Sequence, residues 1–165
     1  MSCGIALTLA LMMTDPNVAM ASAVPPVAAD APISVASEPL FRDIVSRSSS
    51  LKSIVDAWKA NGAADAAGFF ASPDYTGFHA RAVALSETDM QAHLILKERG
   101  TDADLKCILR GISEDLPKKL AAVEAAPNPS ARAVALDELA YLLNDNVEVI
   151  TSPPQHNAQS GLPTG

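Results

Sequence analysis

The sequence predicts an all-α protein, an antiparallel bundle of four to five helices with a disordered N-terminal leader and C-terminal tail. The 165-residue chain is 48% hydrophobic but only 4% aromatic, so its core must consist mainly of Ala, Leu, Val and Ile. In several long stretches, apolar residues recur every three or four positions, as on one face of a helix. Short polar turns join these stretches, and short connections force neighbouring helices to run in opposite directions.

The N-terminus resembles a secretory signal. An apolar run from Gly4 to Met13 is followed by a polar break at residues 14–16 and by Ala21-Ser22-Ala23, a small-x-small cleavage pattern. No Lys or Arg precedes the run, so only the terminal amine could supply the positive charge of such a signal. The alternative is a poorly ordered apolar N-terminus of a cytosolic protein. We expect residues 1–23 to be a signal peptide and the protein to be periplasmic or secreted.

The remaining chain divides by composition into a leader, one domain and a tail. Residues 24–36 contain three prolines among small residues and predict an extended Pro/Ala-rich leader. A single domain is expected over 37–151, because two domains would each be too small to bury a core. Residues 152–165 contain three prolines, two glycines and no apolar periodicity, which predicts a disordered tail. Removal of Cys3 with the signal would leave Cys107 alone, so the fold must be stable without an internal disulfide.

The first helix is expected to begin at Ser37, whose hydroxyl can cap it, with Pro39 in the first turn. It ends at Asn61-Gly62, a natural left-handed stop. Ser48-Ser49-Ser50 is a weak point where bending is plausible, because serine hydroxyls compete for backbone hydrogen bonds. Trp58 is expected to close one end of the core. The predicted apolar stripe consists of Leu40, Ile44, Leu51, Ile54, Val55 and Trp58.

A short helical turn is expected over 63–71, ended by Ser72-Pro73, which can cap the next helix. The pattern then runs to Arg99 and stops at Gly100. Two interpretations stay open for this stretch. One continuous helix would place Tyr75, Phe78, Ala82, Leu85, Asp89, His93 and Leu96 on one face. Alternatively, Ser86 and Asp89 form a capping box at which the helix restarts.

The clearest apolar stripe lies between Asp102, a potential cap, and residue 125. It consists of Leu105, Ile108, Leu109, Ile112, Leu116, Leu120 and Val123. Pro117 interrupts the stripe and predicts a kink or a restart capped by Ser113. Ala103, Cys107 and Gly111 line the opposite side, and their small size predicts that another element approaches there and buries Cys107.

Asn128-Pro129 opens the last predicted helix. Its stripe consists of Ala135, Leu136, Leu139, Leu142 and Leu143. We expect this helix to end around residues 144–146, after which Val147 to Thr151 is either extended or one more helical turn.

Charge and hydropathy argue against two classes of partner. The formal net charge is −7, from 12 basic and 19 acidic residues, and no basic run offers a footprint for nucleic acid or an anionic membrane. No stretch reaches the roughly 18 consecutive apolar residues of a membrane span. The expected partner is an unidentified protein or small ligand, and the sequence does not predict the oligomeric state.

Asp89 and His93 are the candidate metal ligands, since residues four apart project from adjacent turns of one helical face. Two ligands are too few for a divalent metal ion, so a neighbouring helix would have to complete the site. In the structural alternative Asp89 caps a helix and His93 packs at the edge of the stripe. A haem group is the weaker option, held by His79 or His93 with a methionine such as Met90. No cofactor is expected otherwise.

No catalytic constellation is recognisable. Cys107 and His93 are the only plausible nucleophile and base, and a buried, inert cysteine is the more common condition. Paired acids in first turns or on helix surfaces are explained by helix-end stabilisation and solvation. The sequence therefore predicts an exported, non-enzymatic binding or interaction module of the cell envelope. A metal-binding bundle using Asp89 and His93 is the alternative.

Overall fold

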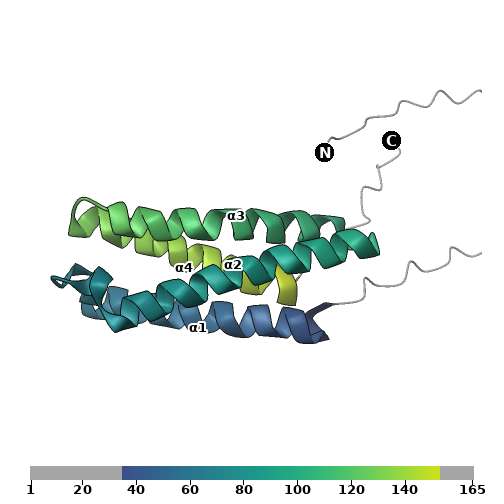
Figure 1. Cartoon of the computed structure of the whole chain (residues 1–165), viewed down its shortest axis with the longest axis horizontal. Coiled ribbons are helices and arrows are strands. Elements are labelled where there is room, and N and C mark those ends of the chain that lie inside the picture. Colours follow the sequence, from purple (N-terminus) through teal and green to yellow (C-terminus); the bar gives the residue numbers. More distant parts are fainter. Residues whose placement is uncertain (1–34, 153–165) are drawn as a thin grey trace, which may run out of the picture. The chain divides into compact units, whose positions relative to one another are not determined.

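The computed structural model describes residues 35–152, and within them four α-helices pack antiparallel, as predicted (Figure 1). The predicted signal peptide, most of the leader and all but the first residue of the tail lie outside the described residues. The helices are α1 (Pro39–Asn61), α2 (Pro73–Arg99), α3 (Ala103–Ala125) and α4 (Pro129–Thr151), with three short 3-10 helices, η1 (Val35–Ser37), η2 (Ala63–Asp65) and η3 (Phe69–Ala71).

The most extensive packing joins α2 to α3 and α1 to α4. Helices α3 and α4 also pack together, whereas α1 and α2 contact each other less. Three residues connect α2 to α3 and three connect α3 to α4, but the α1–α2 connection spans residues 62–72 and contains η2 and η3. The pair of helices joined by this longer connection is also the sequential pair that packs together least. None of the described helices is long and apolar enough to span a membrane.

The start of α1 differs from the prediction. Ser37 lies in η1, and Glu38 occupies the N-cap position without a capping side-chain hydrogen bond. The Glu38 carboxylate instead accepts two hydrogen bonds of 2.9 Å from Arg99 at the end of α2. The end of α1 is as predicted, since Gly62 adopts the left-handed conformation at φ 68°. The helix continues through Ser48-Ser49-Ser50.

Helix α2 is continuous, so the capping-box restart at Ser86 is wrong. Its N-cap, Ser72, accepts a hydrogen bond from the backbone N–H of Tyr75, and Gly100 ends it in the left-handed conformation. The side chains of Ser86 and Asp89 do not turn back to the backbone of their own helix. Both form hydrogen bonds with other helices.

Helix α3 also continues, so of the predicted kink or restart at Pro117 the restart is wrong. Proline has no N–H, which deprives the Ser113 carbonyl of its usual partner within the helix. The Ser86 hydroxyl of α2 donates a 2.8 Å hydrogen bond to this carbonyl. A neighbouring helix thus satisfies the acceptor that proline leaves open. Asp102 occupies the N-cap position, but with φ 47° and no capping side-chain bond.

The predicted close approach along Ala103, Cys107 and Gly111 is wrong. All three residues are exposed, and an added Cβ at Gly111 would meet no atom within 4 Å. The opposite stripe of α3 already packs against both α2 and α4, which leaves this side on the outside of the bundle. Small residues here lie on open surface, and the predicted burial of Cys107 is wrong.

Helix α4 begins as predicted, with the Asn128 side chain accepting a hydrogen bond from the Ala131 N–H. It runs to Thr151, so of the two alternatives for Val147 to Thr151 the helical one is confirmed and the extended one is wrong; Asn146 and Ile150 continue the buried face of the helix. The core contains every residue of the α3 stripe except Ile108, which is half-buried. The largest fully buried side chains are Phe41, Phe78, Ile44, Leu51, Leu85, Leu96, Leu109, Leu116, Leu120, Leu139, Leu143 and Ile150.

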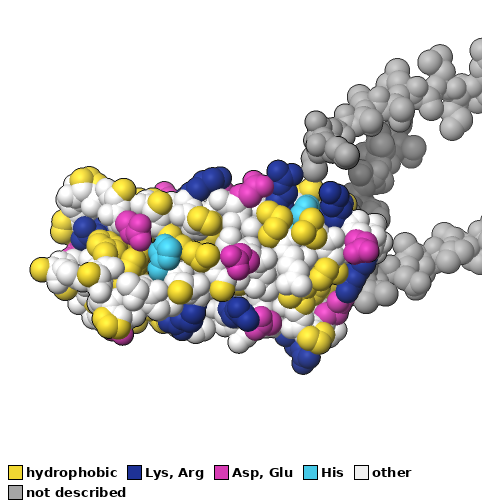
Figure 2. Space-filling view, viewed as in Figure 1, with side chains coloured by type: hydrophobic (Ala, Val, Ile, Leu, Met, Phe, Trp, Pro, Cys, Tyr) yellow, Lys and Arg dark blue, Asp and Glu magenta, His cyan; other side chains and the backbone are white. Residues whose placement is uncertain are grey.

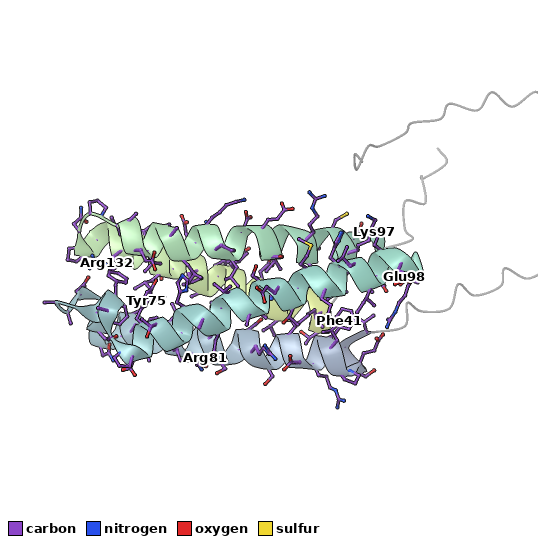
Figure 3. All side chains as sticks on the ribbon, viewed as in Figure 1. Phe41, Tyr75, Arg81, Lys97, Glu98 and Arg132 are labelled. Carbon is purple, nitrogen blue, oxygen red and sulfur yellow. The ribbon has the colours of Figure 1, made fainter. Side chains whose placement is uncertain are left out.

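Aromatic rings gather at the end of the bundle where α1 leads into α2. Trp58 contacts Phe69 and Phe78 edge to face, with centroid distances of 4.9 and 4.6 Å. Tyr75 and Arg132 lie at this end, opposite the end that holds Phe41 (Figure 3). Trp58 therefore closes one end of the core, as predicted.

Candidate functional site

A polar cluster lies in the apolar core between α1, α2 and α4. It consists of Ser48, Asp89 and Asn146, all completely buried. The Asn146 amide nitrogen lies 3.1 and 3.0 Å from the two Asp89 carboxylate oxygens and 3.1 Å from the Ser48 hydroxyl oxygen. One amide group thus donates to acceptors on two other helices.

Asp89 is the only charged residue among the buried side chains of the described residues. Burial removes its carboxylate from water and raises its pKa from the usual 3.8 to about 7, while the hydrogen bond from Asn146 partly opposes this shift. The other charged groups of the described residues lie outside the core, so none of them replaces the hydration that Asp89 loses. Asp89 consequently changes charge near neutral pH.

The Asn146 carbonyl oxygen is buried and has no hydrogen-bond partner among the described residues. An ionised Asp89 can only accept hydrogen bonds, which suits the Asn146 amide nitrogen. A neutral Asp89 carries one hydroxyl donor, which an amide oxygen can accept. The hydrogen bonds present all come from the amide nitrogen, and they are those that an ionised Asp89 accepts.

The structure places the predicted metal ligands Asp89 and His93 on the same helix but gives them separate partners. Asp89 contacts Asn146 of α4, whereas the His93 Nδ1 lies 2.7 Å from the Lys106 carbonyl oxygen of α3. Because a carbonyl only accepts, Nδ1 is the donor in this pair. No group of three or more His, Cys, Asp or Glu side chains within residues 35–152 is arranged to hold a metal ion. The metal site stays a prediction.

The other candidate residues lie apart from this cluster. Cys107 is exposed on the outer side of α3. His79 lies near Glu124 of α3, with 3.9 Å between its Nε2 and a carboxylate oxygen, and the Tyr75 hydroxyl donates a 2.8 Å hydrogen bond to the same oxygen. Burial, and secondly this hydrogen bond, raise the pKa of Tyr75. Met90 is half-buried.

A groove runs along the surface between α1 and α2, where the helices contact each other less. Its first hollow, of about 500 Å³, is lined by Ile54, Trp58, Pro73, Asp74, Gly77 and Arg81. Its second hollow, of about 270 Å³, is lined by Ser46, Arg47, Ser50, Leu51, Arg81 and Ala84. Arg81 is common to both. Together these residues form what we call the α1–α2 groove.

Small side chains explain why the groove stays open. On α2 its wall includes Gly77 and Ala84, and on α1 it includes Ser46 and Ser50. These short side chains leave space between the two helices unfilled. An added Cβ at Gly77 would meet no atom within 4 Å.

Sequence reasoning missed Ser48, Asn146 and the α1–α2 groove. The sequence does indicate that Ser48 and Asn146 are buried, because both continue an apolar stripe. Ser48 follows Ile44 by four positions, and Asn146 follows Leu143 by three. A polar residue in phase with a buried face is a candidate member of a core hydrogen-bond network. The groove gives no such signal, because small residues on a helix also lie on open surface, as Ala103 and Gly111 of α3 do.

Comparison with known proteins adds no assignment. No protein-family model matches the chain, and searches among curated proteins and solved structures found nothing significantly similar.

Proposed function

We propose that the chain is an exported, non-enzymatic binding module of the cell envelope that holds its ligand in the α1–α2 groove. The observation that carries the proposal is the first hollow, which has Trp58 and Ile54 among its lining residues. Ligand sites are commonly concave, about 300–1,000 Å³ in volume and mainly apolar with few polar groups. The hollow fits this description in both size and composition.

No other region of the described surface is as good a candidate for a binding site. Exposed large hydrophobic residues are Leu94, Val134 and Tyr141, on α2 and α4. On the face shown in Figure 2, charged side chains of both signs are interspersed among small apolar areas. Scattered exposed apolar residues are normal on protein surfaces. The groove is therefore the better candidate.

Trp58 is the only tryptophan in the chain and lines the first hollow, so its fluorescence reports on occupancy directly. The probe is N-phenyl-1-naphthylamine, an uncharged dye that accepts energy from tryptophan. We expect saturable energy transfer from Trp58 to the dye in the native protein.

The location is tested by filling the hollow. Gly77→Leu adds a side chain where a Cβ meets nothing, so the helix should tolerate it while the hollow loses volume. Gly111→Leu is the matched control, a similarly uncrowded glycine on the outer side of α3. We expect Gly77→Leu to weaken dye binding at least several-fold and Gly111→Leu to leave it unchanged. If Gly77→Leu binds the dye as tightly as Gly111→Leu does, the proposed location in the first hollow is overturned.

Export is tested separately by the intact mass of protein recovered from the envelope fraction. The apolar run and the Ala21-Ser22-Ala23 pattern support cleavage after Ala23, so the recovered protein should begin at Val24. A full-length chain beginning at Met1 in the cytosolic fraction would contradict both export and cleavage.

A further inference from the structure

The two hollows of the α1–α2 groove differ in chemistry. The first has one tryptophan, one isoleucine and one proline among its six lining residues. The second is lined by two arginines and two serines around Leu51 and Ala84, and no carboxylate lines it. In a chain of net charge −7, this combination of cations and hydroxyl groups is a local exception.

Arg81 is placed to bind a ligand in the groove. Its Nε donates a 3.3 Å hydrogen bond to the Gly77 carbonyl of its own helix. This bond holds the guanidinium beside the groove, while its other two nitrogens have no protein partner among the described residues. Figure 3 shows Arg81 on α2, along its border with α1. A guanidinium with two unused nitrogens suits a carboxylate or phosphate, which it can bind through two parallel hydrogen bonds.

The neighbouring charges determine which way a charged ligand is oriented in the groove. Arg47 adds a second cation, although its Nε is paired with Asp43 at 2.8 Å. Asp74 lines the first hollow and lies seven residues from Arg81, or about 10 Å along the helix axis. A negative group is thus repelled at the Asp74 end and attracted at the Arg81 end. The apolar part of a ligand belongs beside Trp58.

We propose that the ligand is a monomeric amphiphile with one anionic headgroup, its apolar tail against Trp58 and Ile54 and its headgroup between Arg81 and Arg47. This inference rests on the proposed function of the groove. It specifies a class of ligand in which an apolar chain and a single negative charge are both required.

The test compares dodecanoate, its uncharged counterpart dodecanol, and acetate, each below any micelle concentration. Binding is measured by displacement of N-phenyl-1-naphthylamine and by the intrinsic fluorescence of Trp58. We expect dodecanoate to bind about tenfold more tightly than dodecanol, the ratio that about 1.4 kcal/mol provides. Acetate should not displace the dye, because it lacks the tail.

Arg81→Gln should weaken dodecanoate binding about tenfold, to the level of dodecanol, and should change dodecanol binding much less, because only dodecanoate carries the negative charge that the guanidinium attracts. Arg47→Gln should weaken dodecanoate binding less, because Asp43 already pairs with that guanidinium. The matched control is Arg110→Gln, an exposed arginine on α3 outside the groove, which should have no effect.

The outcomes separate the two proposals. If dodecanol and dodecanoate bind equally and Arg81→Gln changes neither, the headgroup inference is overturned while groove binding stands. If the dye binds but dodecanoate does not displace it, the amphiphile is the wrong class of ligand. If Gly77→Leu and native protein bind the dye equally, the proposed function has failed and the inference fails with it.

Discussion

The aromatic end of the bundle and its polar centre are both buried, but different interactions stabilise them. At the aromatic end, Trp58, Phe69 and Phe78 gain stability from the removal of apolar surface from water and from edge-to-face ring contacts. At the centre, Asp89 depends on hydrogen bonds from Asn146 to offset the loss of hydration. The first kind of stability is insensitive to pH, and the second depends on the charge of one carboxyl group.

This difference shows that burial alone does not describe what a position contributes. A buried ring contributes in proportion to its area, whereas a buried carboxylate costs free energy unless its partners are in place. The centre of this bundle is thus a polar exception within an apolar core. Its three polar side chains come from α1, α2 and α4, so its hydrogen bonds link these three helices at one level of the bundle.

The largest effect is expected at the aromatic end. Phe78 is fully buried against Trp58, so Phe78→Ala should lower the free energy of unfolding by about 3–5 kcal/mol, the range for removing a buried aromatic ring. Urea denaturation at several pH values measures this loss, which should be the same at pH 4 and pH 8. Tyr141→Ala, at an aromatic residue that is 72% exposed, is the control and should change stability by no more than about 0.5 kcal/mol.

At the polar centre, the stability of the folded state should depend on pH through Asp89. Because its pKa is about 7 in the folded state and 3.8 when unfolded, the folded state retains the proton between these values. The contribution of Asp89 to the free energy of unfolding is therefore fully present below pH 4. It is lost as the pH rises through 7. The difference between the two pKa values corresponds to at most roughly 4 kcal/mol.

Asp89→Asn removes the titrating group while keeping its shape, and its neutral amide resembles the protonated carboxyl group in having one oxygen acceptor and a donor. Urea denaturation should give similar stabilities for the variant and the native protein near pH 4. The variant should then become the more stable of the two as pH rises to 8. A difference that stays constant across this range would show that Asp89 does not titrate between the two values.

A smaller effect on stability is expected at Ser86, whose hydroxyl donates to the Ser113 carbonyl in place of the backbone N–H that Pro117 lacks. Ser86→Ala leaves the buried Ser113 carbonyl without this partner and should cost about 1–3 kcal/mol. The cost should shrink in a Pro117→Ala background, where the backbone N–H can again reach that carbonyl. Thr88→Ala is the control, because Thr88 donates to the Ala84 carbonyl of its own helix. Equal costs of Ser86→Ala in both backgrounds would show that the two residues are not coupled.

The positions of the helices and most of the surfaces that they bury were predictable from local sequence patterns. The period of the apolar residues, the caps at Ser72 and Asn128 and the left-handed stops at Gly62 and Gly100 are local features, and local features act within a few residues of one another. The long stripe of α3 was predicted for the same reason. The locations of the signal peptide, the leader and the tail were also predicted from the sequence, and these stay predictions.

The roles of the polar and small residues depend instead on how the helices pack. Ser86 could cap its own helix or donate to another, and Asp89 could do the same, because both uses are compatible with the same local sequence. Gly77 and Gly111 are each small residues on a helix, yet one lines the α1–α2 groove and the other lies on open surface. These outcomes depend on how far apart the helices lie and how each is rotated about its axis. Distance and rotation arise from the packing of the whole core, which no single stretch of sequence contains.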